Sequence, residues 1–245
     1  MGLFGRKEIC TVCNTNESDK KLLDGGICKE CIRKCYPFIT TLSWKNISGE
    51  KAIKAIEVST KNNQLLQIFQ PTTKIEKYIS FDANNKLWKP NMPNVVFGYD
   101  DIVSFELLED GESITKGGLG RAVVGGALFG GAGAIVGGVT GKKKTKKEIN
   151  ELKIKVVTRN EMCPEVYINF LVSGSVKSNS ILYKSYKGAA ERTMTEFALI
   201  MDALNERKGN MNSEADEILK YKKLCDDGVI TQEEFEEKKR QLLGI

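Results

Sequence analysis

The sequence predicts an α+β protein of 245 residues built from three parts. Four cysteines in two pairs lie within the first 36 residues, short runs with β-like alternation follow, and helical periodicity dominates the end of the chain. These observations predict domains at 1–36, 37–207 and 214–245, a linker at 208–213, and a glycine-rich insertion at 117–147 in the middle domain.

The composition excludes several kinds of enzyme site. Histidine is absent, which excludes His general bases, Ser–His and Cys–His nucleophile pairs and mixed Cys/His metal sites. The glycine-rich insertion lacks the Lys-Ser/Thr ending of a phosphate-binding P-loop. The net charge of +5 suits an anionic lipid or nucleic-acid surface without choosing between them. We therefore expect a non-enzymatic protein without a small-molecule substrate.

The paired cysteines have the spacing of a metal site. Cys10 and Cys13 form one Cys-x2-Cys unit, and Cys28 and Cys31 form a second after fourteen intervening residues. The N-terminus lacks the long apolar segment of a signal peptide, so we expect a reducing compartment where such pairs bind metal. Since two units complete a tetrahedral thiolate set, the four cysteines predict a structural Zn²⁺ ion. Cys35 is either a further ligand or a buried thiol.

The middle of the chain predicts an antiparallel barrel. A helix is expected at about 48–58, and a capping helix at about 187–207. About seven or eight β-like runs lie between these helices, separated by turn signals such as Asp110-Gly111. The runs are 74–81, 86–89, 95–99, 102–108, 112–116, 151–157, 165–172 and 181–186. Antiparallel strands with one C-terminal capping helix are the architecture of a pleckstrin-homology-like (PH-like) barrel. The glycine-rich insertion would then interrupt a hairpin between 112–116 and 151–157.

The last 32 residues predict a two-helix hairpin. An apolar stripe from Ile218 to Leu224 ends at Gly228, and Thr231 with Glu234 forms a capping box for a second helix. Two helices of this size cannot form a stable core alone, so we expect them to dock on the barrel or on a second copy of themselves.

Three segments resemble known families. The tail resembles the SHOCT (short C-terminal) domain at Asp227–Thr231, Glu233–Phe235 and Leu242–Gly244. The segment Leu22–Cys31 is similar to short bacterial zinc modules of unknown function, and Tyr99–Ile102 with the glycine-rich insertion resembles the bacterial PH-like domains found beside them. The resemblance implies a bacterial or phage-borne cytoplasmic protein without a catalytic mechanism, whose tail is associated with oligomerisation.

The glycine-rich insertion has the spacing of closely packed helices. Small residues recur at every fourth position: Ala122, Gly126, Gly130, Ala134 and Gly138. On a helix they would form a groove that lets another backbone approach, as in packed membrane helices. The nineteen uncharged residues from 122 to 140 would span about 28 Å as a helix, close to the hydrocarbon thickness of a bilayer.

The sequence of the insertion is equally compatible with a two-armed hairpin. AVVGG at 122–126 returns as AIVGG at 134–138, and the apolar residues Leu128, Phe129, Ile135 and Val136 lie in and between the copies. Arms of nine or ten residues have the length of a membrane β-strand, and several chains together could close such hairpins into a barrel. The alternatives without a membrane are a surface loop or a glycine-rich helical hairpin packed on the barrel.

Basic residues flank the uncharged segment 122–140 of the insertion and predict contacts with an anionic surface. They are Arg121, Lys142, Lys143, Lys144, Lys146 and Lys147. We expect a self-assembling protein whose insertion associates with or enters the membrane, an oligomeric pore-forming effector of anti-phage defence. It would be cytoplasmic and conditionally at the inner face of the cell membrane, with a second copy, the membrane and a protein trigger as partners.

The alternative function places the activity in the zinc module. That module would bind nucleic acid or act as a protein-interaction adaptor, and the glycine-rich insertion would be a soluble loop. The basic residues of the module, such as Lys20, Lys21 and Arg33, are nearly balanced by acidic residues, and no set of stacking aromatics accompanies them. Nucleic acid is therefore the less favoured partner.

Overall fold

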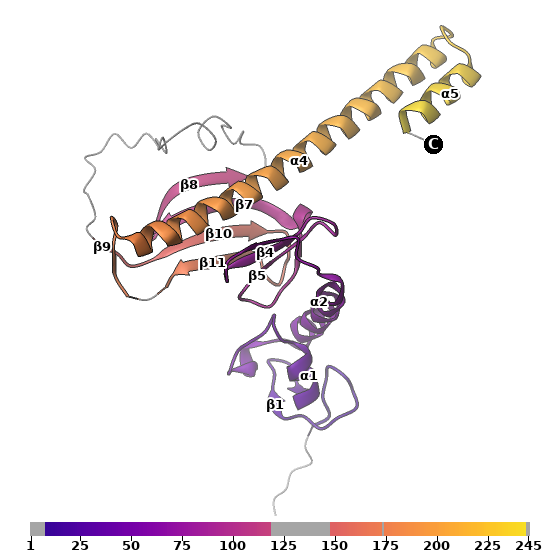
Figure 1. The fold of residues 1–245 in the computed structure, drawn as a ribbon. Coiled ribbons are helices and arrows are strands. Elements are labelled where there is room, and N and C mark those ends of the chain that lie inside the picture. The colour runs from indigo at the N-terminus through magenta and orange to yellow at the C-terminus, as the bar shows by residue number, and fades with distance from the viewer. Residues whose placement is uncertain (1–7, 119–147, 173, 244–245) are drawn as a thin grey trace, which may run out of the picture. The chain divides into compact units, whose positions relative to one another are not determined.

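The computed structural model describes residues 8–118, 148–172 and 174–243 (Figure 1). Its helices and antiparallel sheets confirm the predicted α+β class. The predicted membrane, self-association and anionic-surface residues lie outside the described residues: Arg121, Ala122, Gly126, Leu128, Phe129, Gly130, Ala134, Ile135, Val136, Gly138, Lys142, Lys143, Lys144, Lys146 and Lys147.

Residues 8–47, called here the cysteine module, fold as a short hairpin followed by a helix. Strand β1 (Lys20–Lys21) pairs antiparallel with β2 (Gly26–Ile27), and helix α1 (Lys29–Lys34) follows. A 3-10 turn, η1 (Trp44–Asn46), ends the module. Its buried core continues past the boundary predicted at residue 36, because Trp44 and two alanines of the next helix belong to it.

Helix α2 (Gly49–Ile68) is about twice as long as the helix predicted at 48–58. Ser48 is its N-cap, and the Ser48 hydroxyl accepts a hydrogen bond from Lys51 N–H. Beyond residue 58 the buried side chains are the polar Ser59 and Asn62, each of which is hydrogen-bonded. Because these buried residues are polar, the sequence shows no apolar stripe in the second half of this helix, and the prediction ended too early.

Two four-stranded antiparallel sheets form the middle of the chain. The first has the order β3-β4-β5-β6, with β3 (Thr73–Ile75), β4 (Ile79–Asp82), β5 (Leu87–Pro90) and β6 (Phe97–Gly98). The second has the order β11-β10-β7-β8, with β7 (Ile102–Glu109), β8 (Glu112–Gly118), β10 (Leu152–Thr158) and β11 (Glu165–Leu171). A 3-10 turn, η2 (Tyr99–Asp101), joins the sheets, and β9 (Glu148–Ile149) pairs with β12 (Val176–Lys177).

The two sheets share an apolar core. Alternate residues of β10, namely Leu152, Ile154 and Val156, are fully buried. The ring of Tyr78, just before β4, lies 4.6 Å from that of Phe170 in β11, measured between centroids. This contact joins the buried faces of the two sheets.

Two expectations about the sheets are wrong. Within the described residues the strands do not close into a barrel, because each ladder stays within its own set of four and η2 separates β6 from β7.

The glycine-rich insertion does not interrupt a hairpin either. Strand β7 pairs with both β8 and β10, so β8 lies at the edge of the sheet as far as the described residues go and does not pair with β10.

Helix α4 (Ile181–Asp226) provides the predicted capping helix. The Tyr183 hydroxyl donates to Glu109 of β7, and Arg192 forms an ion pair with Glu76 at 2.8 Å. The expectation of a strand at 181–186 is wrong, because Ser180 accepts a hydrogen bond from Tyr183 N–H and caps a helix there. Ala189, Ala190 and Met194 are buried on this part of α4.

The end of the chain is a helical hairpin. Helix α4 continues through 208–213, the segment predicted as a linker: it contains no proline, and its single glycine costs a helix only about 1 kcal/mol. Gly228 has a φ of +71° in the turn before α5 (Gln232–Leu243). Thr231 and Glu234 form the predicted capping box, with bonds of 2.8 and 3.2 Å.

Asp82 at the end of β4 yields a prediction about stability. Its buried carboxylate accepts hydrogen bonds from Gln70, Asn84 and Asn85 N–H and from the Asn85 side-chain amide. Burial alone would raise the pKa of Asp82, but these donors outweigh it and lower that pKa below its usual value. We expect Asp82→Ala to lower the free energy of unfolding by about 2–4 kcal/mol, measured by chemical denaturation.

The contribution of Asp82 should also depend on pH. Because the folded pKa is lowered, the stabilisation is fully present above the unfolded pKa of about 4 and is lost as pH falls through the folded pKa. The difference between wild type and Asp82→Ala should therefore shrink in acid. Asp202→Ala, at an exposed position of α4, is the control. Equal stability of the wild type and Asp82→Ala would contradict this assignment.

Candidate metal centre

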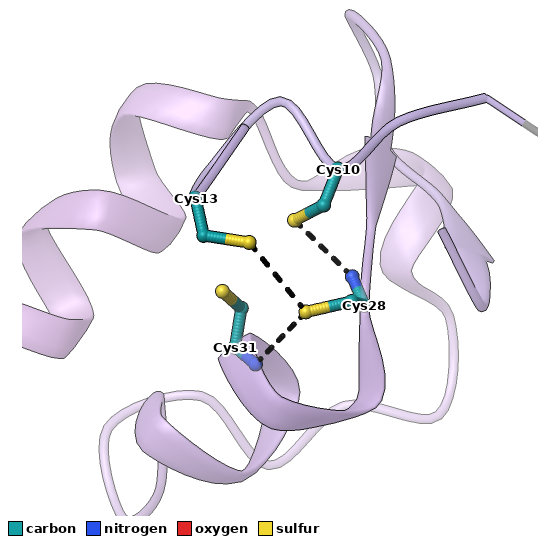
Figure 2. Close-up of side chains that lie close together, drawn as sticks. All are labelled: Cys10, Cys13, Cys28 and Cys31. Carbon is teal, nitrogen blue, oxygen red and sulfur yellow. Dashed lines mark hydrogen bonds between the residues drawn. The ribbon is translucent and has the colours of Figure 1, made fainter. Parts of the chain in front are cut away.

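The four predicted cysteines come together in one cluster (Figure 2). Cys10 and Cys13 lie on the turn before β1, Cys28 directly follows β2, and Cys31 lies in the first turn of α1. Their sulfur atoms all lie within 4.8 Å of one another, and the Cys13 and Cys28 sulfurs are 3.9 Å apart. A tetrahedral ion with metal–sulfur bonds of about 2.3 Å would place its ligands about 3.8 Å apart. The arrangement is therefore compatible with a four-thiolate metal site.

The backbone donates hydrogen bonds to these sulfurs. Cys28 N–H donates to Cys10 Sγ at 3.3 Å, and Cys31 N–H donates to Cys28 Sγ at 3.5 Å, which also makes Cys28 the N-cap of α1 (Figure 2). The Asn16 side-chain amide donates to Cys28 Sγ at 3.7 Å. Donors of this kind stabilise thiolates, as ligation of a metal requires.

Two glycines let the hairpin approach the first cysteine turn. A Cβ at Gly26 would lie 2.1 Å from Ser18 Oγ, and one at Gly25 would lie 2.3 Å from Thr11 Cγ2. Thr11 is adjacent to Cys10, and its hydroxyl donates to Gly26 O at 3.0 Å. Glycine at these two positions therefore allows the second cysteine pair to lie close to the first.

The thiols of the cluster differ in acidity. Hydrogen bonds from the backbone of Asn16 and Thr15 lower the pKa of Cys13 to about 6. Burial raises the pKa of Cys28, but donors from Cys31 and Asn16 outweigh it, so its pKa is also lowered. Burial and the neighbouring thiols raise the pKa of Cys31. Four thiolates this close together repel one another, so holding all four in this form requires a bound cation.

Cys35 is a buried thiol outside the cluster. Its Sγ donates to Ala52 O at 3.5 Å, which places it between α1 and α2. The four-cysteine group does not include it. Of the two expectations for this residue, the buried thiol agrees with the structure.

Sequence reasoning missed the residue that connects the cluster to α2. Asp24, in the turn between β1 and β2, accepts a hydrogen bond from Gly49 N–H at 2.8 Å. Its carboxylate lies at the positive N-terminal end of α2, where a negative charge is stabilising. The Asp-Gly-Gly sequence signals the turn, but no local pattern indicates a partner 25 residues away.

Comparison with known families now identifies most of the chain. Residues 47–172, slightly more than half of the sequence, match the family described as "Glycine zipper containing PH domain". The chain belongs to this family. A second match, "Short C-terminal domain" (SHOCT), covers residues 216–243. No curated protein and no solved structure matches the chain.

These matches confirm two of the resemblances found in the sequence. The glycine-zipper PH domain comprises α2 and the strands up to β11, and the cysteine cluster lies before it. The SHOCT domain comprises the end of α4 and α5. Both domains indicate a role in protein interaction or assembly. Among the described residues, no helix is long and apolar enough to span a membrane.

The cluster predicts one bound metal ion per chain. Cys13→Ser should remove it, because the site would keep only three thiolates. Cys35→Ser is the matched control and should retain the metal, since that thiol lies outside the cluster. The measurement is metal content by mass spectrometry, together with the absorption spectrum of the Co²⁺-loaded protein. Loss of metal from both variants alike would contradict the assignment.

Proposed function

We propose that this glycine-zipper PH protein is a non-enzymatic, self-assembling membrane effector. Its four cysteines bind a structural Zn²⁺ ion, its SHOCT hairpin brings copies together, and its glycine-rich insertion enters the membrane in the assembled state. The protein is cytoplasmic before assembly and at the inner face of the cell membrane afterwards. Conditional permeabilisation in defence against phage is the process that this action would serve.

The observation that carries the proposal is the exposed apolar surface of the SHOCT hairpin. Phe235 is buried, but Leu219 and Val229 are about two-thirds exposed, and Leu243 is about half exposed. A pair of helices with so little enclosed surface is not stable by itself in water. A second copy supplies the missing contacts without any further component.

The proposal assigns the membrane contact to the glycine-rich insertion. In the chain it comes after strand β8, which ends at Gly118, and before β9, which begins at Glu148. The spacing of small residues from Ala122 to Gly138 agrees with the glycine zipper in the family's description. A segment so rich in glycine is only weakly apolar, which favours insertion after assembly over permanent residence in lipid.

The choice of zinc follows from the ligands. Four thiolates in a tetrahedral arrangement are typical of structural zinc sites, and carboxylate or histidine ligands are absent from this cluster. The ion would fix the module without taking part in a reaction.

Charge pairing in the cysteine module favours the membrane proposal over nucleic-acid binding. Lys29 lies 3.7 Å from Asp19, and Arg33 lies 3.2 Å from Glu30. Carboxylates this close to the cations oppose the approach of a phosphate backbone.

The assembly step predicts an oligomer that depends on the tail. Leu219→Glu combined with Leu224→Glu should convert it to monomers, because charges would replace the exposed apolar side chains. Leu199→Glu, at an exposed position of α4 before the SHOCT domain, should leave the oligomer intact. Light scattering coupled to size-exclusion chromatography gives the mass. A monomeric wild type at all concentrations would contradict the assembly step.

The membrane step is tested with vesicles of phosphatidylethanolamine and phosphatidylglycerol. Wild-type protein should float with the vesicles and release an enclosed dye. Replacing Gly126, Gly130 and Gly138 by Leu should abolish dye release, because bulky side chains keep neighbouring segments apart. Replacing the lysines of 142–147 by Gln should weaken flotation by roughly tenfold or more.

The matched control neutralises lysines elsewhere. Lys20→Gln with Lys21→Gln removes the exposed cations of β1 and should change neither flotation nor dye release. If wild-type protein neither floats nor releases dye at any concentration, the membrane function is wrong.

A further inference from the structure

Helix α2 is shared by the cysteine module and the PH domain. Its first half forms one wall of the module, because Ala52 and Ala55 are fully buried in the module's core. The Cys35 thiol donates to Ala52 O at 3.5 Å. One turn after Ala55, the Ser59 hydroxyl donates to Tyr36 O at 2.7 Å. The module therefore contacts α2 over about three turns.

The start of α2 is held by the hairpin that carries the cysteines. Gly49 N–H donates to Asp24 Oδ1 at 2.8 Å, and Leu23 N–H donates to Ile47 O at 2.9 Å. Asp24 lies four residues before Cys28, on the turn between β1 and β2. The position of the Asp24 carboxylate thus depends on where the second cysteine pair is fixed.

The second half of α2 is bonded to the first sheet. Asn62 is buried, its Oδ1 accepts from Val96 N–H at 2.8 Å, and its Nδ2 donates to Asn94 O at 3.1 Å. At the end of the helix, Ile68 O accepts from the Asn85 amide at 3.2 Å. The segment that leads into β6 and the turn between β4 and β5 are therefore fixed to this helix.

The second sheet also contacts the module. Met162, in the loop between β10 and β11, packs against the buried core of the module. In the same loop, Glu161 forms an ion pair with Lys54 of α2. The β10–β11 loop thus contacts both the cysteine module and the first half of α2.

We infer that the metal centre is a regulatory element of the PH domain: metal binding at the four cysteines orders α2, and α2 transmits this order to the segment before β6 and to the β10–β11 loop. The inference rests on the proposed metal binding. Without the ion, the cysteine pairs are not held together, so the hydrogen bond from Gly49 N–H to Asp24 and the packing against Ala52 and Ala55 are weakened. The first half of α2 would then be exposed to water, where a short helical segment without packing contacts is only marginally stable and frays.

The test is hydrogen–deuterium exchange of the full chain, measured with the metal bound, after its removal by a chelator under reducing conditions, and after Zn²⁺ is added back. Amides of 50–59 should exchange roughly tenfold faster or more without metal. Amides of 94–96 and 159–163 should also exchange faster, and the added metal should restore their protection. The turn around Asp110 and Gly111 between β7 and β8 is the internal control and should not change.

Two variants separate the routes of transmission. Asn62→Ala should remove the metal response at 94–96 but keep the response at 50–59, because only the link to Val96 and Asn94 is lost. Lys54→Ala with Met162→Ala should remove the response at 159–163 alone.

The outcomes distinguish this inference from the metal centre itself. A chain that binds no metal overturns both. Metal binding with unchanged exchange at 94–96 and 159–163 overturns the inference and leaves the metal centre standing. Equal acceleration of the β7–β8 turn means general unfolding and also overturns the selective coupling.

Discussion

The structure of the N-terminal region depends on four sulfur atoms that lie within 4.8 Å of one another. As thiolates they repel one another, and as thiols they bond too weakly to hold two turns and a two-stranded hairpin in place. A single bound cation would remove the repulsion and replace the weak contacts with four ligand bonds. The glycines at 25 and 26 and the donors from Cys28, Cys31 and Asn16 all serve to bring the sulfurs to this spacing.

Helix α2 carries this constraint into the rest of the molecule. The match to the glycine-zipper PH family begins at residue 47, so α2 belongs to the PH domain by sequence. Its alanines at 52 and 55 nevertheless lie in the core of the cysteine module. A domain boundary drawn from composition alone therefore separates residues that pack together. The same helix is a wall for the cysteine module and a support for the strands.

Local patterns in the sequence predicted the parts of the structure that depend on local physics. The Cys-x2-Cys spacing located the cysteine cluster, the alternation in 151–157 and 165–172 located strands β10 and β11, and Thr231 with Glu234 located the start of α5. Nonlocal pairing could not be predicted, so the position of β7 between β8 and β10 was missed. Two helical segments were also missed. The apolar pattern of α2 stops before the polar Asn62, so the end of that helix was not predicted. The run 181–186 alternates like a strand, although Ser180 caps a helix there.

The central claim is that a four-thiolate metal centre organises this glycine-zipper PH protein. X-ray absorption at the zinc edge of the full chain tests it most directly, because the method reports the ligand atoms and their distances. The account predicts four sulfur ligands at about 2.3 Å and no nitrogen or oxygen ligand. A shell with fewer than four sulfurs, or with oxygen at about 2.0–2.2 Å, would contradict it.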